Sequence, residues 1–142
     1  MRAGGKKLAV TNGCFDLLHA GHVNYLAAAR AQADALLVLV NSDRSVRELK
    51  GDGRPLNPQN DRALVLAALQ SVDAVCIFDE PRATRLLTLA APDIYVKGGD
   101  YSADQLPQEE RDAVAQCGGR IVVLGHIPGR STSALLEKLA RL

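Results

Sequence analysis

The 142-residue sequence has few aromatic residues, no tryptophan and almost no net charge. Aromatic residues make up 4% of the chain, too few for the stacking platforms that bind single-stranded nucleic acid. A formal net charge of +1 gives no basis for bulk binding to nucleic acid or a membrane surface. No apolar run approaches the roughly 18 residues of a membrane span, and the residues before Thr11 contain no apolar stretch of signal-peptide length. We therefore expect a cytoplasmic protein that binds neither nucleic acid nor membrane.

Cysteine is also scarce. Cys14, Cys76 and Cys117 are odd in number and widely spaced, so they predict neither a zinc site nor a disulfide framework. Cys76 lies in the apolar run AVCIF, which is typical of core packing. Cys14 lies in a polar motif, so a reactive thiol has to be considered there, although no carboxylate–histidine pair is arranged to activate it.

Short apolar runs of strand type alternate with helical patterns along the whole chain. We predict strands at 6–12, 35–41, 73–78, 93–96 and 120–125, and helices at 22–33, 57–72, 81–90, 107–117 and 131–142. The continuous apolar run ALLVLVN is typical of a strand buried on both faces. This alternation predicts a single domain over residues 1–142 with an α/β fold, a Rossmann-like doubly wound sheet of about five parallel strands with helices on both faces.

Ligands bind beyond the carboxyl ends of the strands in such sheets. Four polar stretches follow predicted strands, at 11–22, 41–43 (NSD), 97–101 (KGGDY) and 129–133 (GRSTS). The longest irregular connection is predicted at 44–56, and it carries the basic residues Arg44, Arg47, Lys50 and Arg54. This connection could be a solvated loop or a mobile loop that grips phosphate.

The stretch TNGCFDLLHAGH, residues 11–22, joins the first strand to the first helix. A helix N-terminus favours anions, and glycines allow the backbone to approach a ligand closely. His19 and His22 can donate to charge that develops on a phosphate, and their spacing puts both rings on one side of a helical turn. The pattern predicts a phosphate site. Two histidines could instead bind zinc with Asp16, but no other ligand of the right kind is evident nearby.

The stretch GCFDLLHAGHVNYL resembles the signature of the cytidylyltransferase-like nucleotidyltransferases, whose H-x-G-H element corresponds to residues 19–22. Within that superfamily, VNSDRSVRELKGDGRPLNPQNDR, LAALQSVDAV, PDIYVKGGDY, GGRIVVL and GRSTSALLEKL resemble the heptose 1-phosphate adenylyltransferase domain, which many bacteria fuse to a sugar kinase. The resemblance implies transfer of AMP from ATP to D-glycero-D-manno-heptose 1-phosphate, giving ADP-heptose and pyrophosphate. It also implies Mg²⁺ accompanying ATP, a homodimer, and a cell-envelope glycan pathway with separate heptose kinase and phosphatase steps.

The resemblance further implies roles for individual residues. The catalytic group would be His19, His22 and Lys50. The nucleotide would be bound by Asn12, Gly13, Cys14, Phe15, His22, Lys97, Gly98, Asp100, Ser131 and Thr132. The acceptor or its phosphate would face Asn41, Asp43 and Arg62. Mg²⁺ would be carried by the phosphates of ATP, while Asp16 would fix the loop or contribute to the metal.

The chemistry of this reaction agrees with the residues present. A sugar phosphate is an anionic nucleophile near neutral pH, because its second pKa is about 6. The protein therefore has only to align two polyanions and neutralise charge.

The chain also departs from the family pattern at several positions. Ser131-Thr132-Ser133 stands where the family commonly has S-T-T, and His126 stands where related cytidylyltransferases carry arginine. The stretch 102–114 departs from the family's glycine-containing segment, which leaves the sugar and its anomer open. Two alternatives follow. One is a cytidylyltransferase acting on glycerol 3-phosphate or a similar polyol or amino-alcohol phosphate. The other is a catalytically inactive nucleotide-binding regulatory module.

Overall fold

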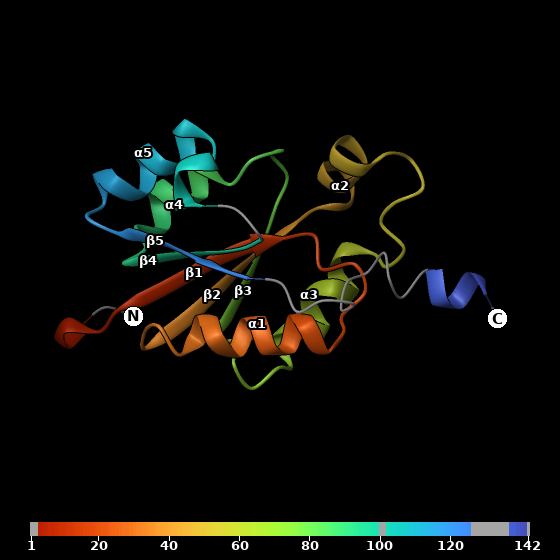
Figure 1. The fold of residues 1–142 in the computed structure, drawn as a ribbon, viewed down its shortest axis with the longest axis horizontal. Coiled ribbons are helices and arrows are strands. Elements are labelled where there is room, and N and C mark those ends of the chain that lie inside the picture. The colour runs from red at the N-terminus through yellow and green to blue at the C-terminus, as the bar shows by residue number, and fades with distance from the viewer. Residues whose placement is uncertain (1–2, 100–101, 126–136, 142) are drawn as a thin grey trace.

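The computed structural model describes residues 3–99, 102–125 and 137–141. Its strands are β1 (Leu8–Gly13), β2 (Ala35–Asn41), β3 (Ala74–Phe78), β4 (Ile94–Gly98) and β5 (Arg120–Leu124). All neighbouring strands pair in parallel, and their order in the sheet is β3-β2-β1-β4-β5 (Figure 1). The predicted strands and their parallel arrangement are therefore confirmed, with small shifts at the strand ends.

Helices cover both faces of the sheet (Figure 1). One face is covered by α1 (Ala20–Arg30) and α3 (Gln59–Ala67), and the other by α4 (Thr84–Ala90) and α5 (Gln108–Gln116). Two short 3₁₀ helices, η1 (Ala3–Gly5) and η2 (Ala103–Gln105), precede β1 and α5. Of the helix predicted at 131–142, residues 137–140 are helical, residue 141 is in a turn, and residues 131–136 and 142 lie outside the described residues. No helix in the described ranges combines the length and apolar character that crossing a bilayer requires.

The hydrophobic core has two halves, one on each side of the sheet. The half under α1 and α3 contains Leu26 and Leu66, and the half under α4 and α5 contains Leu87 and Val114. Successive side chains of a strand point to opposite faces, so β1 contributes to both halves. The apolar residues of β1 are all buried: Leu8, Ala9 and Val10. The centre of the sheet is thus a rigid support for the loops at its carboxyl edge.

The prediction of an irregular connection over 44–56 is wrong, because its first part forms α2 (Asp43–Lys50). The side chain of Ser42 accepts a hydrogen bond from the backbone N–H of Ser45, which caps the helix. Acidic Asp43 in the first turn and basic Lys50 in the last turn also suit the helix dipole. The charge-rich sequence concealed this helix, which is anchored by buried Ser45 and Val46.

Two other expectations are corrected by the fold. The helix predicted from Asn57 begins at Gln59 with Pro58 as its N-cap, because the Asn57 side chain donates to the Asp16 carbonyl instead. Cys76 is exposed, so the expectation of core packing is wrong. Cys76 lies on β3, which is an edge strand of the sheet and is therefore less covered than the strands in the middle.

Candidate functional site

The strand order reverses direction at β1, which lies between β2 and β4. β1 pairs with β2 along its whole length, but it pairs with β4 only at Ala9 with Ile94 and at Val10 with Tyr95. Beyond these pairs the carboxyl-terminal residues 11–13 of β1 and 96–98 of β4 are unpaired with each other, and we call them the split. A ligand binds at such a topological switch point in open α/β sheets. The split is therefore the expected ligand site.

Polar side chains from both strands meet at the split. The side-chain oxygen of Asn12 accepts hydrogen bonds from the Tyr95 hydroxyl at 2.6 Å and from Lys97 Nζ at 3.0 Å. Burial lowers the pKa of Lys97, and the negative charge of Glu110 on α5 opposes that effect. Asn12 and Lys97 were predicted from sequence to bind the nucleotide, and the fold brings them into contact.

The two histidines lie at the N-terminus of α1. His19 is the N-cap, and its Nδ1 accepts from the backbone N–H of Gly21 at 3.1 Å. His22 Nδ1 accepts from the backbone N–H of His19 at 3.3 Å, and the ring centroids are 4.0 Å apart. Because Nδ1 accepts a hydrogen bond in both rings, a ring in its neutral form carries its proton on Nε2. Each imidazole can thus offer an Nε2–H donor at the positive end of a helix.

Positive charge gathers around His22. The pKa of His22 is lowered to about 4 by burial and, in addition, by electrostatic interactions with His19 and Lys50. Lys50 is the exposed last residue of α2, and Gly51 follows it with a φ of 98°. Residues far apart in sequence thus act on one imidazole, which is neutral at pH 7. This is the trio that the sequence predicted to be catalytic.

Asp16 lies in the loop between β1 and α1 and anchors to it the connection that follows α2. Its carboxylate accepts hydrogen bonds from the backbone N–H of Leu56 at 2.8 Å and of Asn57 at 2.9 Å, and from Arg54 Nη1 at 3.2 Å. Burial acts to raise the pKa of Asp16, but the hydrogen bonds from Asn57, Leu56 and Arg54 outweigh it and lower the pKa. Of the two roles predicted for Asp16, the contacts favour fixing the loop.

Arg62 lies at the centre of a second set of contacts and is only 2% exposed. Its guanidinium donates to the backbone carbonyls of Cys14 at 2.7 Å, Asn41 at 2.8 Å and Asn57 at 2.9 Å. It also forms an ion pair with Asp43 at 2.9 Å. The structure therefore brings Asn41, Asp43 and Arg62 together, as the acceptor-site prediction requires. The guanidinium also holds three segments of chain in place.

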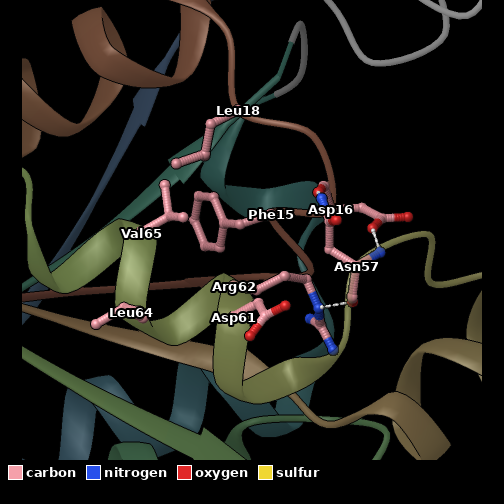
Figure 2. A pocket seen from close by; sticks show the side chains of 8 residues that line it. All are labelled: Phe15, Asp16, Leu18, Asn57, Asp61, Arg62, Leu64 and Val65. Atoms are coloured by element: carbon pink, nitrogen blue, oxygen red, sulfur yellow. Dashed lines mark hydrogen bonds between the residues drawn. The ribbon is translucent and has the colours of Figure 1, made fainter.

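A cavity of about 320 Å³ lies beside these contacts (Figure 2). The ring of Phe15 lies beside the side chains of Leu18 and Val65 in its wall (Figure 2). Phe15 has a φ of 49°, which is uncommon for a bulky residue. A Cβ on Gly13 would lie 2.9 Å from the Phe15 ring, so this position requires glycine. The side chain of Phe15 is thus used for packing, which leaves its backbone for any contact with a ligand.

A family model described as cytidylyltransferase-like matches residues 10–134, a range that includes the split, both histidines, Asp16 and Arg62. The chain belongs to the cytidylyltransferase-like family.

Individual relatives agree with this membership. The chain is 51% identical over 138 residues to the bifunctional protein HldE of Alkalilimnicola ehrlichii, which covers 97% of the chain and 28% of the relative. It is 52% identical over 135 residues to that of Mesorhizobium japonicum, covering 95% of the chain and 27% of the relative. The chain thus spans little more than a quarter of the length of these curated relatives. A solved structure, the lipopolysaccharide core biosynthesis protein from Thermoplasma volcanium GSS1, aligns with a TM-score of 0.69 and 25% identity, covering 87% of this chain and 98% of that one.

The site of this cytidylyltransferase-like chain contains residues that sequence reasoning missed. Arg54 and Asn57 hold Asp16, and the hydroxyl of Tyr25 on α1 lies at the split. Glu110 is 5% exposed, and one of its carboxylate oxygens has no hydrogen-bond partner among the described residues. The departure of 102–114 from the family pattern was the only signal that pointed toward Glu110.

Three predicted nucleotide contacts lie outside the described residues: Asp100, Ser131 and Thr132. Burial raises the pKa of Cys14 even though the positive charges of Lys50, Arg62 and Arg54 act to lower it. The Cys14 thiol is therefore protonated at neutral pH, which argues against a reactive thiolate in the motif.

Proposed function

We propose that this cytidylyltransferase-like chain is an adenylyltransferase that transfers AMP from ATP to D-glycero-D-manno-heptose 1-phosphate, giving ADP-heptose and pyrophosphate. The observation that carries the proposal is the pair of imidazoles at the N-terminus of α1, with Lys50 close enough to shift the pKa of His22. Such a cluster of donors and positive charge suits a polyphosphate. The motifs in 41–62 and 93–101 favour a heptose phosphate as acceptor, and the identity of about 50% with bifunctional HldE proteins supports that choice.

In the proposed reaction, an oxygen of the sugar phosphate attacks the α-phosphorus of ATP. A bond forms between that oxygen and the α-phosphorus, and the bond from the α-phosphorus to the bridging oxygen of the β-phosphate breaks. Pyrophosphate leaves with the negative charge. The Nε2–H groups of His19 and His22 and the ammonium of Lys50 stabilise this developing charge. A bound polyanion also raises the pKa of a neighbouring imidazole, which strengthens His22 as a donor.

The remaining predicted residues divide between the two substrates in this proposal. Asn12, Lys97 and Gly98 at the split bind the nucleotide together with the backbone of residues 13–15. Asp100, Ser131 and Thr132 are proposed to complete that site. Asn41 and Asp43 face the acceptor, and Arg62 fixes both of them through the Asn41 carbonyl and the Asp43 carboxylate.

Mg²⁺ enters the proposal with ATP. Within residues 3–99, 102–125 and 137–141 there is no group of three or more His, Cys, Asp or Glu side chains that could hold a metal ion. The carboxylate of Asp16 already accepts several N–H groups. We therefore propose that the phosphate oxygens of ATP hold the Mg²⁺, which neutralises charge during the displacement.

We further propose a homodimer, for which α3 offers exposed apolar side chains. Leu64 is 70% exposed and Val65 is 49% exposed. Sedimentation of the purified protein tests this part of the proposal, and a monomer at micromolar concentration would contradict it.

One assay tests the reaction against its alternatives. Pyrophosphate release is measured with each of the four common nucleoside triphosphates against a panel of sugar and polyol phosphates. We expect the highest kcat/KM with ATP and heptose 1-phosphate, reversible loss of activity on chelation with EDTA, and recovery with Mg²⁺ or Mn²⁺. Preference for CTP and glycerol 3-phosphate would favour the cytidylyltransferase alternative. Nucleotide binding without turnover on any acceptor would favour the regulatory module.

A further inference from the structure

The split is bridged by side chains on the face that α1 covers. The backbone carbonyl of Val96 on β4 lies 2.8 Å from the hydroxyl of Thr11 on β1 and 2.9 Å from the hydroxyl of Tyr25 on α1. The two hydroxyl oxygens are 2.6 Å apart. Each hydroxyl has one proton, so when one donates to the Val96 carbonyl the other can donate to its partner hydroxyl. These contacts take the place of the backbone pairing that ends at Val10 and Tyr95.

The opposite face of the split is bridged separately. There the side chain of Asn12 on β1 accepts from Tyr95 and Lys97 of β4. The separation of the two strand ends is therefore set by polar side chains on both faces, and not by the sheet ladder. Thr11 is 0% exposed, so its hydrogen bonds are made in a region from which water is excluded. Hydrogen bonds in such regions resist exchange with solvent and hold geometry well.

Tyr25 contributes its ring as well as its hydroxyl. A Cβ built on Gly98 would lie 3.1 Å from Cε1 of Tyr25, so the ring packs closely against the last residue of β4. Tyr25 also lies one helical turn after His22 on α1. One side chain thus connects the helix that carries the histidines to the end of the strand that carries Lys97 and Gly98.

We infer that Tyr25 is a positioning residue for nucleotide binding, which sets the separation of β1 and β4 at the split and fixes the end of β4 relative to the histidines. The inference rests on the proposed function only in taking ATP as the ligand. Tyr25 touches no reacting atom in this proposal. It acts through Thr11, Val96 and Gly98. Its loss should therefore alter the affinity for the nucleotide more than the stability of the fold.

The test is the affinity for ATP in the presence of Mg²⁺ and without acceptor, measured by calorimetry on the whole chain. Tyr25→Phe removes the hydroxyl and keeps the ring. We expect it to weaken ATP binding roughly three- to tenfold, the range that corresponds to one hydrogen bond of ordinary net strength. Thr11→Val should have a similar effect. In the double variant, ATP affinity should fall by less than the product of the two single fold-reductions, because both hydroxyls share the Val96 carbonyl.

Thr88→Val provides the matched control, since the Thr88 hydroxyl donates to the Thr84 carbonyl at an exposed position of α4. It should leave ATP affinity unchanged. Urea unfolding of each variant separates a positioning role from a purely structural one. If Tyr25→Phe is less stable but binds ATP as tightly as the wild type, the inference is wrong.

Other outcomes separate this inference from the proposed function. A wild-type protein that binds ATP but transfers no AMP to any acceptor overturns the proposed reaction, while the ATP affinities still decide the role of Tyr25. Normal transfer with unchanged affinity in Tyr25→Phe overturns only the inference. A wild-type protein that binds no ATP overturns both.

Discussion

Two clusters of polar and charged side chains lie near the connection between β1 and α1. They differ in how many hydrogen bonds and ion pairs they form within the protein. In the anchor cluster, Arg62 and Asp16 are buried and hydrogen-bonded to backbone groups. Arg62 donates to the Cys14 carbonyl near Asp16, and Asp16 accepts from the Asn57 N–H near Arg62. In the histidine cluster, His19 and Lys50 act electrostatically on the neutral imidazole of His22, and among the described residues Lys50 forms no ion pair. In the proposed function, the paired charges of the anchor cluster serve as scaffold, whereas the histidine cluster serves an incoming anionic ligand. The predictions below test this distinction.

The largest effect is expected from His22→Ala in the histidine cluster. Turnover should fall by at least about 10²-fold, the scale for removing one preorganised donor to the transition state. The free energy of unfolding should fall by no more than about 1 kcal/mol, the scale for losing one capping hydrogen bond, here from the His19 N–H to His22 Nδ1. Asn24→Ala, an exposed change on the same helix, is the control and should leave both quantities unchanged. A well-folded His22→Ala protein with near-normal kinetics would remove this residue from the catalytic group.

Arg62→Leu tests the anchor cluster, where we expect the main effect on stability. It leaves the carbonyls of Cys14, Asn41 and Asn57 without their donor and Asp43 without its partner. We expect the free energy of unfolding to fall by about 2 kcal/mol, because buried polar groups lose their partners. Arg44→Leu removes an arginine whose ion pairs are exposed, and it should change stability by less than about 0.5 kcal/mol. Equal effects of the two changes in urea unfolding would contradict the scaffold role.

Lys50→Ala should reduce kcat by more than tenfold and leave ATP affinity, measured without acceptor, nearly unchanged. Lys50 is exposed at the end of α2 and is followed by Gly51, which has a positive φ of 98°, so the contact with phosphate can form mainly in the reacting complex. Lys6→Ala is the matched control, because Lys6 is an exposed lysine just before β1, at the amino edge of the sheet. An unchanged kcat in Lys50→Ala would make this residue an ordinary surface charge.

The last effect is expected in the pH dependence of stability. His22 has a pKa of about 4 in the folded protein, below its ordinary value of 6.5, so the unfolded chain binds more protons between these two pH values. Stability should therefore fall as the pH is lowered from about 6.5 toward 4. Asp16, with its lowered pKa, should add a further loss in more acidic solution. Urea unfolding of wild type and His22→Gln across this range should show that the free energy of unfolding depends less steeply on pH in the variant. Identical pH dependence in the two proteins would contradict the lowered pKa of His22.

Much of the fold could be predicted because it depends on local patterns. The run ALLVLVN is apolar throughout, and β2 is indeed buried in the middle of the sheet. The helix α2 was missed because Arg44, Arg47 and Lys50 obscure any apolar stripe, while the residue that ties it down, Ser45, donates to the distant Glu80 carbonyl. The exposure of Cys76 depends on strand order, which an apolar pentapeptide does not encode.

The same division applies to the site. The histidines and Lys97 could be proposed from the sequence because the histidines lie on the connection after β1 and Lys97 lies near the end of β4. The carboxyl ends of parallel strands meet at one edge of a sheet. The bonds from Leu56 and Asn57 to Asp16 span about forty residues, and the bond from Tyr25 to Val96 spans seventy-one. Contacts of that kind arise from tertiary packing and leave no spacing signal in the chain.

The central position of β1 has a consequence for the breathing motions of the molecule. Local opening in a folded protein starts at edges and exposed ends, while the strands in the middle exchange their amide hydrogens mainly through global unfolding. The loop with both histidines begins where β1 ends, and β1 has a neighbouring strand on each side. Deuterium should therefore enter the amides of Ala9 and Val10 far more slowly than those of β3 at the sheet edge. The ligand loop is thus attached to the part of the molecule that opens last, and fluctuations of the outer strands leave its base in place.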